Sequence, residues 1–169
     1  SRLAPPISAS LWLNTPALMK GYFRRDDLTA KAVADGWFMT GDIGCIDALG
    51  RLYLRGRERD EINKGGMKIY PSDIDAVVER YSAASDVCAF ALDDPIYGQA
   101  VGMAVVLNDA GEETIRGLFD WMKSQLAEHK MPSRWWMIDA IPRTSRGKIN
   151  RDAVKAAAAE AQQQEPSLS

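Results

Sequence analysis

The sequence predicts an α+β fold made of two blocks, a β-rich segment and a small domain with the order β-α-β-β-α-β. Three observations support this fold class. Apolar residues alternate in the first third of the chain, as in strands, and recur at helical spacing in two later stretches. A charged segment with adjacent glycines, Gly56–Pro71, separates the blocks. We place the β-rich segment at 1–58, the α+β domain at 59–155 and a polar tail at 156–169.

The first block contains short elements bounded by glycines and charged residues. They are a strand at Ile7–Leu13, a helix from Asp26 or Asp27 to Ala34 that Gly36 ends, and a hairpin of Ile43–Asp47 and Arg51–Arg55 with its turn at 48–50. The apolar surface of this block is too small to form an independent core. We therefore expect the block to pack on another part of the protein.

The second block has a clearer periodicity. The expected elements are a strand at Lys68–Tyr70, a helix opened by Pro71 with Ser72 as its N-cap, strands at Val87–Leu92 and Val101–Leu107, a helix over Ile115–Leu126, and a strand at Arg134–Ile138. Asp75 stands three residues after Ser72, which is close to a capping box. This order predicts a sheet with helices on one face. An alanine-rich helix is expected after Arg151.

Composition excludes several classes of function. Apolar residues make up 46% of the chain and charged residues 26%, as in ordinary globular proteins. The net charge of −2, with both signs interspersed, argues against nucleic-acid binding. No apolar run approaches the roughly 18 residues of a membrane span. Cys45 and Cys88 form no CxxC pair and His129 is the one histidine, so we expect no metal site and a reduced, cytoplasmic protein.

The segment Pro142–Ile149 is the strongest candidate for chemistry. It is a basic loop in which Gly147 directly precedes Lys148. Glycine permits unusual backbone angles and close approach, and a lysine can deliver a mobile positive charge to a phosphate or carboxylate. It is not a Walker A loop, because Pro142 stands where the first glycine is required. Taken alone, such a segment is more often an ordinary basic turn.

Two further segments carry weaker signals. The charges and glycines of Gly56–Pro71 predict an exposed, bendable connector. The alternative is an ordinary surface loop. Asp42 follows Gly41, and a carboxylate there can accept hydrogen bonds from a vicinal diol such as a ribose, as acidic residues do in dinucleotide sites. Taken alone, Asp42 is more often a turn residue.

Together, the order and spacing of these segments resemble the late motifs of the adenylate-forming (ANL) superfamily, which includes acyl- and aryl-CoA synthetases, peptide-synthetase adenylation domains and luciferases. Met19–Phe23 resembles the family's GY segment, Thr40-Gly41-Asp42 its TGD, Gly56–Pro71 its hinge motif, and Pro142–Arg151 its PxxxxGKxxR motif. The resemblance covers about residues 8–155. It rests on the order of the four motifs together rather than on any single motif. It implies that the first block belongs to the β subdomain of a large N-terminal domain, and that the second is the C-terminal lid.

The resemblance also implies roles for single residues in the first half-reaction. Asp42 would bind the ribose hydroxyls of ATP, and Arg57 would contact the nucleotide. Lys148 would bridge the carboxylate and the α-phosphate during adenylation.

For the second half-reaction, Gly65 and Gly66 would line the pantetheine path. Arg59 stands at the position of the family's rotation hinge, where Asp or Lys is frequent. Arginine departs from that pattern, but it is also a long polar side chain that can stay hydrated during a rotation.

These expectations describe the C-terminal portion of an acid–thiol ligase that adenylates a carboxylic acid with ATP and Mg²⁺ and passes the acyl group to CoA. The family's phosphate loop, adenine pocket and acyl pocket lie upstream of anything in this chain. We therefore expect the large N-terminal domain as partner and no ligase activity from this chain alone. Two alternatives stay open. One is an enzyme that loads a carrier-protein pantetheine, and the other is a non-catalytic remnant that binds a partner, against which the joint presence of Lys148, Asp42 and Arg57 argues.

Overall fold

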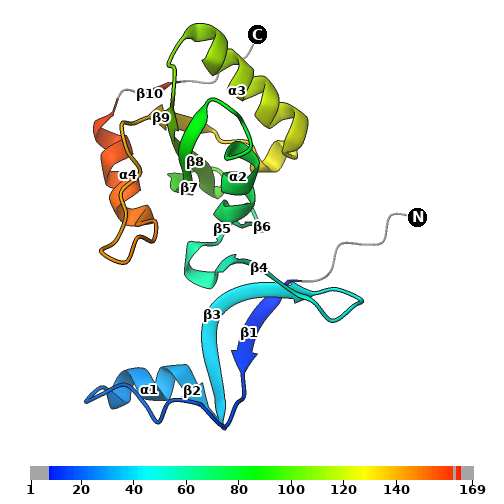
Figure 1. The fold of residues 1–169 in the computed structure, drawn as a ribbon, viewed down its shortest axis with the longest axis vertical. Coiled ribbons are helices and arrows are strands. Elements are labelled where there is room, and N and C mark those ends of the chain that lie inside the picture. The colour runs from blue at the N-terminus through cyan, green and yellow to red at the C-terminus, as the bar shows by residue number, and fades with distance from the viewer. Residues whose placement is uncertain (1–7, 162, 165–169) are drawn as a thin grey trace. The chain divides into compact units, whose positions relative to one another are not determined.

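The computed structural model describes residues 8–161 and 163–164, and it divides into two compact units, Ser1–Arg59 and Asp60–Ser169 (Figure 1). The first unit is a small antiparallel sheet with one helix. Its elements are β1 (Ala9–Leu13), α1 (Asp26–Ala32), β2 (Val33–Ala34), β3 (Trp37–Ile46) and β4 (Leu52–Arg57), followed by a 3-10 turn at Glu58–Asp60. The long strand β3 pairs with β1, β2 and β4.

The expected hairpin of the first unit is confirmed, with differences at the ends of elements. The helix stops at Ala32, because Val33 and Ala34 pair with β3 as a short strand instead of continuing the helix. Gly36, with φ of 78°, lies in the turn between this short strand, β2, and β3. The strand predicted at Ile43–Asp47 begins earlier, at Trp37. Ile7, the first residue of the first predicted strand, lies outside the described residues.

The second unit is built on a larger mixed sheet. Its elements are β5 (Ile62–Lys64), β6 (Met67–Ile69), α2 (Pro71–Val78), β7 (Ala84–Asp94), β8 (Gly98–Leu107), α3 (Glu112–Gln125), a 3-10 turn at Glu128–Lys130, β9 (Arg134–Met137), α4 (Arg151–Glu160) and β10 (Gln163–Gln164). The strand order is β10-β9-β8-β5-β6, and β7 also pairs with β8. Only the β8–β9 pair is parallel among the described strands. From β6 to β9 the order is the predicted β-α-β-β-α-β.

Two hydrophobic clusters lie on the two faces of this sheet. Alternate residues of β7 point to opposite faces, as the pleat of a strand requires. Val87 and Ala89 join α2 and α3 in one cluster, whereas Cys88 and Phe90 join α4 in the other. Figure 1 shows α3 and α4 on either side of the strands. The prediction of helices on one face therefore holds for α2 and α3, while the alanine-rich helix α4 covers the other face and runs to Glu160.

Two local predictions are wrong. Gly56–Pro71 is not a bendable connector throughout, because β5 and β6 form a hairpin within it and bury Ile62 and Ile69 completely. Ser72 is not the N-cap of α2, since the helix already starts at Pro71 and Tyr70 holds the cap position without a side-chain cap bond. Proline suits this first helical position because its missing N–H is not needed there. No helix in the described part of the chain is long and apolar enough to cross a membrane.

Candidate functional site

Asp42 and Arg57 lie directly opposite each other on β3 and β4 of the first unit. Arg57 Nε is 2.8 Å from Asp42 Oδ1, and Arg57 Nη1 donates a hydrogen bond of 2.9 Å to the carbonyl of Thr40. The Asp42 side chain is 28% exposed and that of Arg57 is 47% exposed. A partly exposed carboxylate can accept further hydrogen bonds from a hydroxylated ligand. The guanidinium held beside it can contact an anionic group of the same ligand.

The backbone around Asp42 is bent and tied to the neighbouring strand. Gly41 has φ of 69°, a left-handed conformation that favours glycine. The Thr40 hydroxyl accepts from the Asp42 N–H at 3.0 Å and donates to the Leu11 carbonyl of β1 at 2.9 Å. The Thr-Gly-Asp sequence therefore fixes where the Asp42 carboxylate points.

Lys148 lies in the second unit, on a closed turn between β9 and α4. Arg143 and Ile149 pair as an isolated antiparallel bridge. Inside it, the Thr144 N–H donates to the Lys148 carbonyl at 2.7 Å, and the Gly147 N–H donates to the Thr144 carbonyl at 2.9 Å. Gly147 has φ of 77°, so the glycine before the lysine is required by the turn. Lys148 is exposed, and its ammonium has no hydrogen-bond or ion-pair partner within the described residues.

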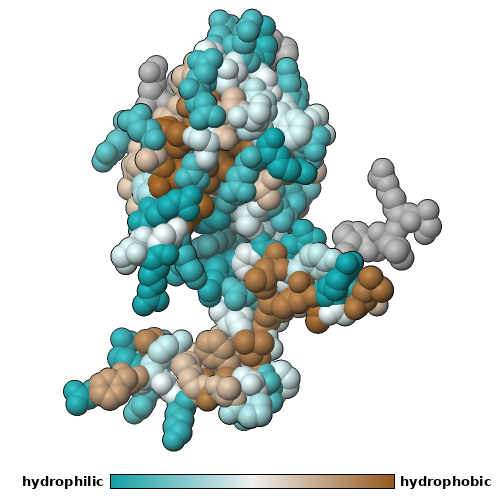
Figure 2. Space-filling view, in the orientation of Figure 1, coloured by the Kyte–Doolittle hydropathy of each residue, from teal (hydrophilic) through white to brown (hydrophobic). Residues whose placement is uncertain are grey.

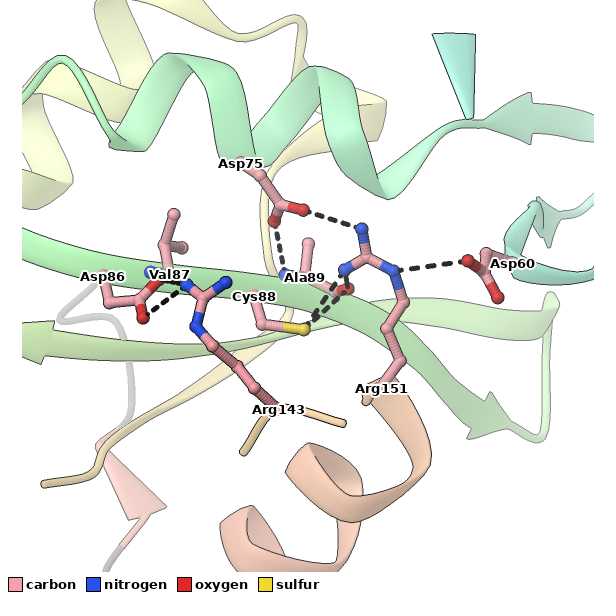
Figure 3. Close-up of polar contacts among 8 residues, drawn as sticks. All are labelled: Asp60, Asp75, Asp86, Val87, Cys88, Ala89, Arg143 and Arg151. Carbon is pink, nitrogen blue, oxygen red and sulfur yellow. Dashed lines mark hydrogen bonds and ion pairs between the residues drawn. The ribbon is translucent and has the colours of Figure 1, made fainter. Parts of the chain in front are cut away.

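Two arginines connect this turn to β7 (Figure 3). Arg143 makes two bonds to the Asp86 carboxylate, at 2.9 and 2.8 Å. Arg151 Nη2 is 2.8 Å from Asp75 Oδ2, and Arg151 Nη1 donates to the Ala89 carbonyl at 2.7 Å and to Cys88 Sγ at 3.1 Å. Both flanks of the Lys148 turn are thus fixed to the same strand.

Asp75 is the one buried charged residue in the described part of the chain. Burial raises the pKa of Asp75 to about 6, against the opposing effects of the Arg151 guanidinium and the Ala89 N–H. Burial likewise raises the pKa of the Cys88 thiol to about 12, so this thiol is protonated and unreactive at neutral pH. The sequence signal for this pair is an aspartate between Ile74 and Val78 on the apolar stripe of α2, which the capping-box interpretation does not explain.

The glycine pair and the expected hinge lie on other turns. Gly65 and Gly66, with φ of 58° and 88°, form the turn between β5 and β6. The Gly65 N–H donates to the Tyr97 carbonyl at 2.9 Å, and a Cβ added at Gly65 would lie 3.1 Å from the Tyr97 ring. A Cβ added at Gly66 would meet nothing within 4 Å. Arg59 lies in the Glu58–Asp60 turn, as the last residue of the first unit.

The structure thus brings two of the predicted residues, Asp42 and Arg57, into contact, and it places Lys148 and the glycine pair on separate turns of the second unit. The described residues contain no group of three or more His, Cys, Asp or Glu side chains that could hold a metal ion.

Comparison with known proteins identifies the family. Residues 73–148 match the AMP-binding enzyme C-terminal domain. The chain is 35% identical to a probable CoA ligase of Humulus lupulus, over 89% of the chain and 29% of that protein. It is 34% identical to a fatty acid–[acyl-carrier-protein] ligase of Streptomyces coeruleorubidus, over 88% of the chain and 29% of that protein.

A similar solved structure is o-succinylbenzoate CoA synthetase of Bacillus subtilis in complex with its acyl-adenylate intermediate, with a TM-score of 0.83 and 27% identity over 98% of this chain and 33% of that one. The chain thus spans about 30% of the length of the relatives it matches. It belongs to the AMP-binding, adenylate-forming (ANL) superfamily and corresponds to the C-terminal region of its acyl-CoA ligases.

Proposed function

We propose that this chain acts in the ATP-dependent adenylation of a carboxylic acid, as the C-terminal portion of an acid–thiol ligase that transfers the acyl group to CoA. The observation that carries the proposal is the Lys148 turn, which is fixed on both flanks and presents an ammonium that has no partner among residues 8–161 and 163–164. Membership in the family and likeness to a CoA synthetase that holds an acyl-adenylate support it.

In the first half-reaction, an oxygen of the acid attacks the α-phosphorus of ATP, the bond to pyrophosphate breaks, and an acyl-AMP forms. Negative charge develops around the phosphorus, and a preorganised cation lowers that barrier. Lys148 supplies the cation. Asp42 orients the ribose through its hydroxyls, and Arg57 contacts the nucleotide. Mg²⁺ would neutralise phosphate charge when bound with ATP, and we assign its binding mainly to a larger N-terminal domain, to which residues 1–58 would belong.

In the second half-reaction, a thiol sulfur attacks the acyl carbonyl carbon, AMP leaves with the carboxylate oxygen, and the thiol proton passes to solvent. We assign the turn of Gly65 and Gly66 to the pantetheine arm, because a backbone without side chains lets a thin chain pass closely. Residues 59–155 would rotate about Arg59 between the two steps, removing Lys148 and presenting this turn.

The acceptor has a second candidate. The likeness to an acyl-carrier-protein ligase favours a carrier-protein pantetheine as the alternative to CoA. Thioester formation by the complete enzyme with CoA and with a pantetheinylated carrier protein, after a panel of fatty and aromatic acids has identified a substrate, distinguishes them. A complete protein that adenylates no acid of the panel but binds a partner would instead support the non-catalytic remnant.

The variant Lys148→Ala in the complete enzyme tests the proposal. We expect adenylation, measured as pyrophosphate release, to slow by roughly 10²–10³, the loss typical of one preorganised electrostatic contact. Thioester formation from synthetic acyl-AMP and CoA should persist. Lys155→Ala is the matched control, because Lys155 is an exposed lysine of α4 whose ion pair with Asp93 is 3.8 Å long. If the Lys148→Ala variant adenylates at the wild-type rate, Lys148 is only part of a basic surface turn.

A further inference from the structure

The ion pair between Asp75 and Arg151 is unusual, because it lies at the edge of a small hydrophobic core. Among the described residues Asp75 is the one buried charge, with 6% of its surface exposed. Desolvation of two charges cancels much of their attraction, so apolar replacements of a buried pair are often neutral or stabilising. Net stability is therefore a weak reason for this pair to exist, and its geometry offers a better one.

The pair binds both backbone groups of one residue on β7. Asp75 Oδ1 accepts from the Ala89 N–H at 2.6 Å, and Arg151 Nη1 donates to the Ala89 carbonyl at 2.7 Å. Among the described strands β7 pairs only with β8, so these groups lie on its open edge. The two side chains replace a missing neighbouring strand there, and they join α2, β7 and the start of α4 (Figure 3).

Arg151 is the first residue of α4 and stands three residues after Lys148. The other flank of the turn has a second anchor, since Arg143 binds Asp86 near the start of β7 and donates to the Gly147 carbonyl at 3.3 Å. The two anchors meet β7 at Asp86 and Ala89, so the turn between them is held across a short stretch of one strand. Arg151 Nε also lies 3.6 Å from Asp60, the first residue of the second unit.

We propose that Arg151, held in place by Asp75, is a positioning residue for Lys148. It fixes the C-terminal flank of the lysine turn to β7 and thereby the direction in which the ammonium is presented. The effect on adenylation rests on the proposed function, because that function assigns Lys148 its reaction. The anchoring itself is a property of the second unit.

The kinetic test uses the complete enzyme with Arg151→Gln, Asp75→Asn and, as the conservative variant, Arg151→Lys. We expect Arg151→Gln to slow adenylation by about 10- to 100-fold, the loss that a misplacement of roughly 1 Å can cause. Thioester formation from synthetic acyl-AMP should be unchanged, and Arg151→Lys should restore part of the rate. In a Lys148→Ala background, Arg151→Gln should cause no further loss, because residues that act as a unit are non-additive. The control is Arg116→Gln, which breaks an exposed pair with Glu112 on α3.

The second test measures amide hydrogen exchange in the same proteins and is independent of the reaction. The Thr144 and Gly147 amides, which close the lysine turn, should exchange faster in Arg151→Gln and Asp75→Asn but not in Arg116→Gln. Unchanged exchange would overturn the proposal. So would equal loss of both half-reactions, which would mean a role in folding alone. Faster exchange in an enzyme whose wild type adenylates no acid would support the positioning role and refute the proposed function instead.

Discussion

The two units differ in how well each buries its own apolar residues. In the described part of the first unit, only Ile43 and Cys45 are buried apolar residues, whereas the second unit contains two buried clusters. Large apolar side chains of the first unit are exposed instead, and Figure 2 shows apolar surface gathered along its strands. They are Trp12, Leu13, Tyr22, Phe23, Trp37, Met39, Ile46, Leu49, Leu52, Tyr53 and Leu54.

This difference separates a unit with its own core from one without. Single exposed apolar residues are common on proteins, but an extended apolar face usually marks an interface. The chain spans about 30% of its curated relatives, so we propose that the rest of a longer enzyme covers this face. In the described part of the second unit, fewer large apolar side chains are exposed, namely Met67, Ile96 and Tyr97.

Matched core and surface substitutions test the contrast most strongly. In the 169-residue chain, Ile74→Ala should lower the free energy of unfolding by about 2–5 kcal/mol, because Ile74 is fully buried. Leu54→Ala should change it by no more than about 0.5 kcal/mol, because Leu54 is 66% exposed. Urea denaturation measures both. In the complete enzyme Leu54→Ala should cost more. Equal costs in the short chain would show that the first unit has its own core.

Arg59→Pro tests whether the boundary between the units is a pivot. Proline fixes φ near −65° and would restrict the Glu58–Asp60 turn. In the complete enzyme we expect acyl-AMP formation to persist, while thioester formation falls by about 10²-fold, as for a misplaced reacting group. Separate assays of the two half-reactions measure this. Equal losses in both would move the pivot away from Arg59.

Asp42→Ala asks whether the first unit contributes to nucleotide binding despite its missing core. Loss of a hydrogen bond to a charged acceptor costs about 1.5–3 kcal/mol, which is about 10- to 150-fold in ATP affinity. Steady-state titration of ATP in the complete enzyme measures it. Asp27→Ala is the matched control, because Asp27 is also an aspartate of this unit paired with an arginine, Arg25. If both variants behave alike, Asp42 has only a structural role in β3.

The remaining prediction concerns the pH dependence of the buried charge of the second unit. Because burial raises the pKa of Asp75 from 3.8 to about 6, the folded chain holds a proton that the unfolded chain has lost between these pH values. This group therefore favours folding at low pH, and its contribution falls as pH rises from about 4 to 6. The wild type should lose stability relative to Asp75→Asn over that window, as measured by urea denaturation at several pH values. The opposite slope would show that the Arg151 charge outweighs burial.

Most of the second unit could be predicted from sequence, because β7 and β8 contain apolar runs of strand length and α3 carries an apolar stripe at helical spacing. The β5–β6 hairpin could not, since each strand has three residues and a single buried isoleucine among charged neighbours. The glycines at 41 and 44 likewise concealed the length of β3.

The residues of the candidate site likewise fall into those that local sequence could predict and those that it could not. Local motifs pointed to Asp42, Arg57 and Lys148, because each stands beside a glycine or within a characteristic run of residues. Their functional roles stay predictions. The pairing of Asp75 with Arg151 could not be found locally, because it joins residues 76 positions apart and depends on how α2 and α4 meet the same strand.

That separation in sequence has a consequence for the order of folding. The β7–β8 hairpin forms through contacts between near neighbours, whereas the Asp75–Arg151 bond closes a segment of 76 residues and must wait for β9 and the crossover helix α3. We expect α4, and with it the lysine turn, to dock late in folding. Interactions that form after the transition state act mainly on the unfolding rate. The part of the chain that presents Lys148 would then be the last to assemble and among the first to be released.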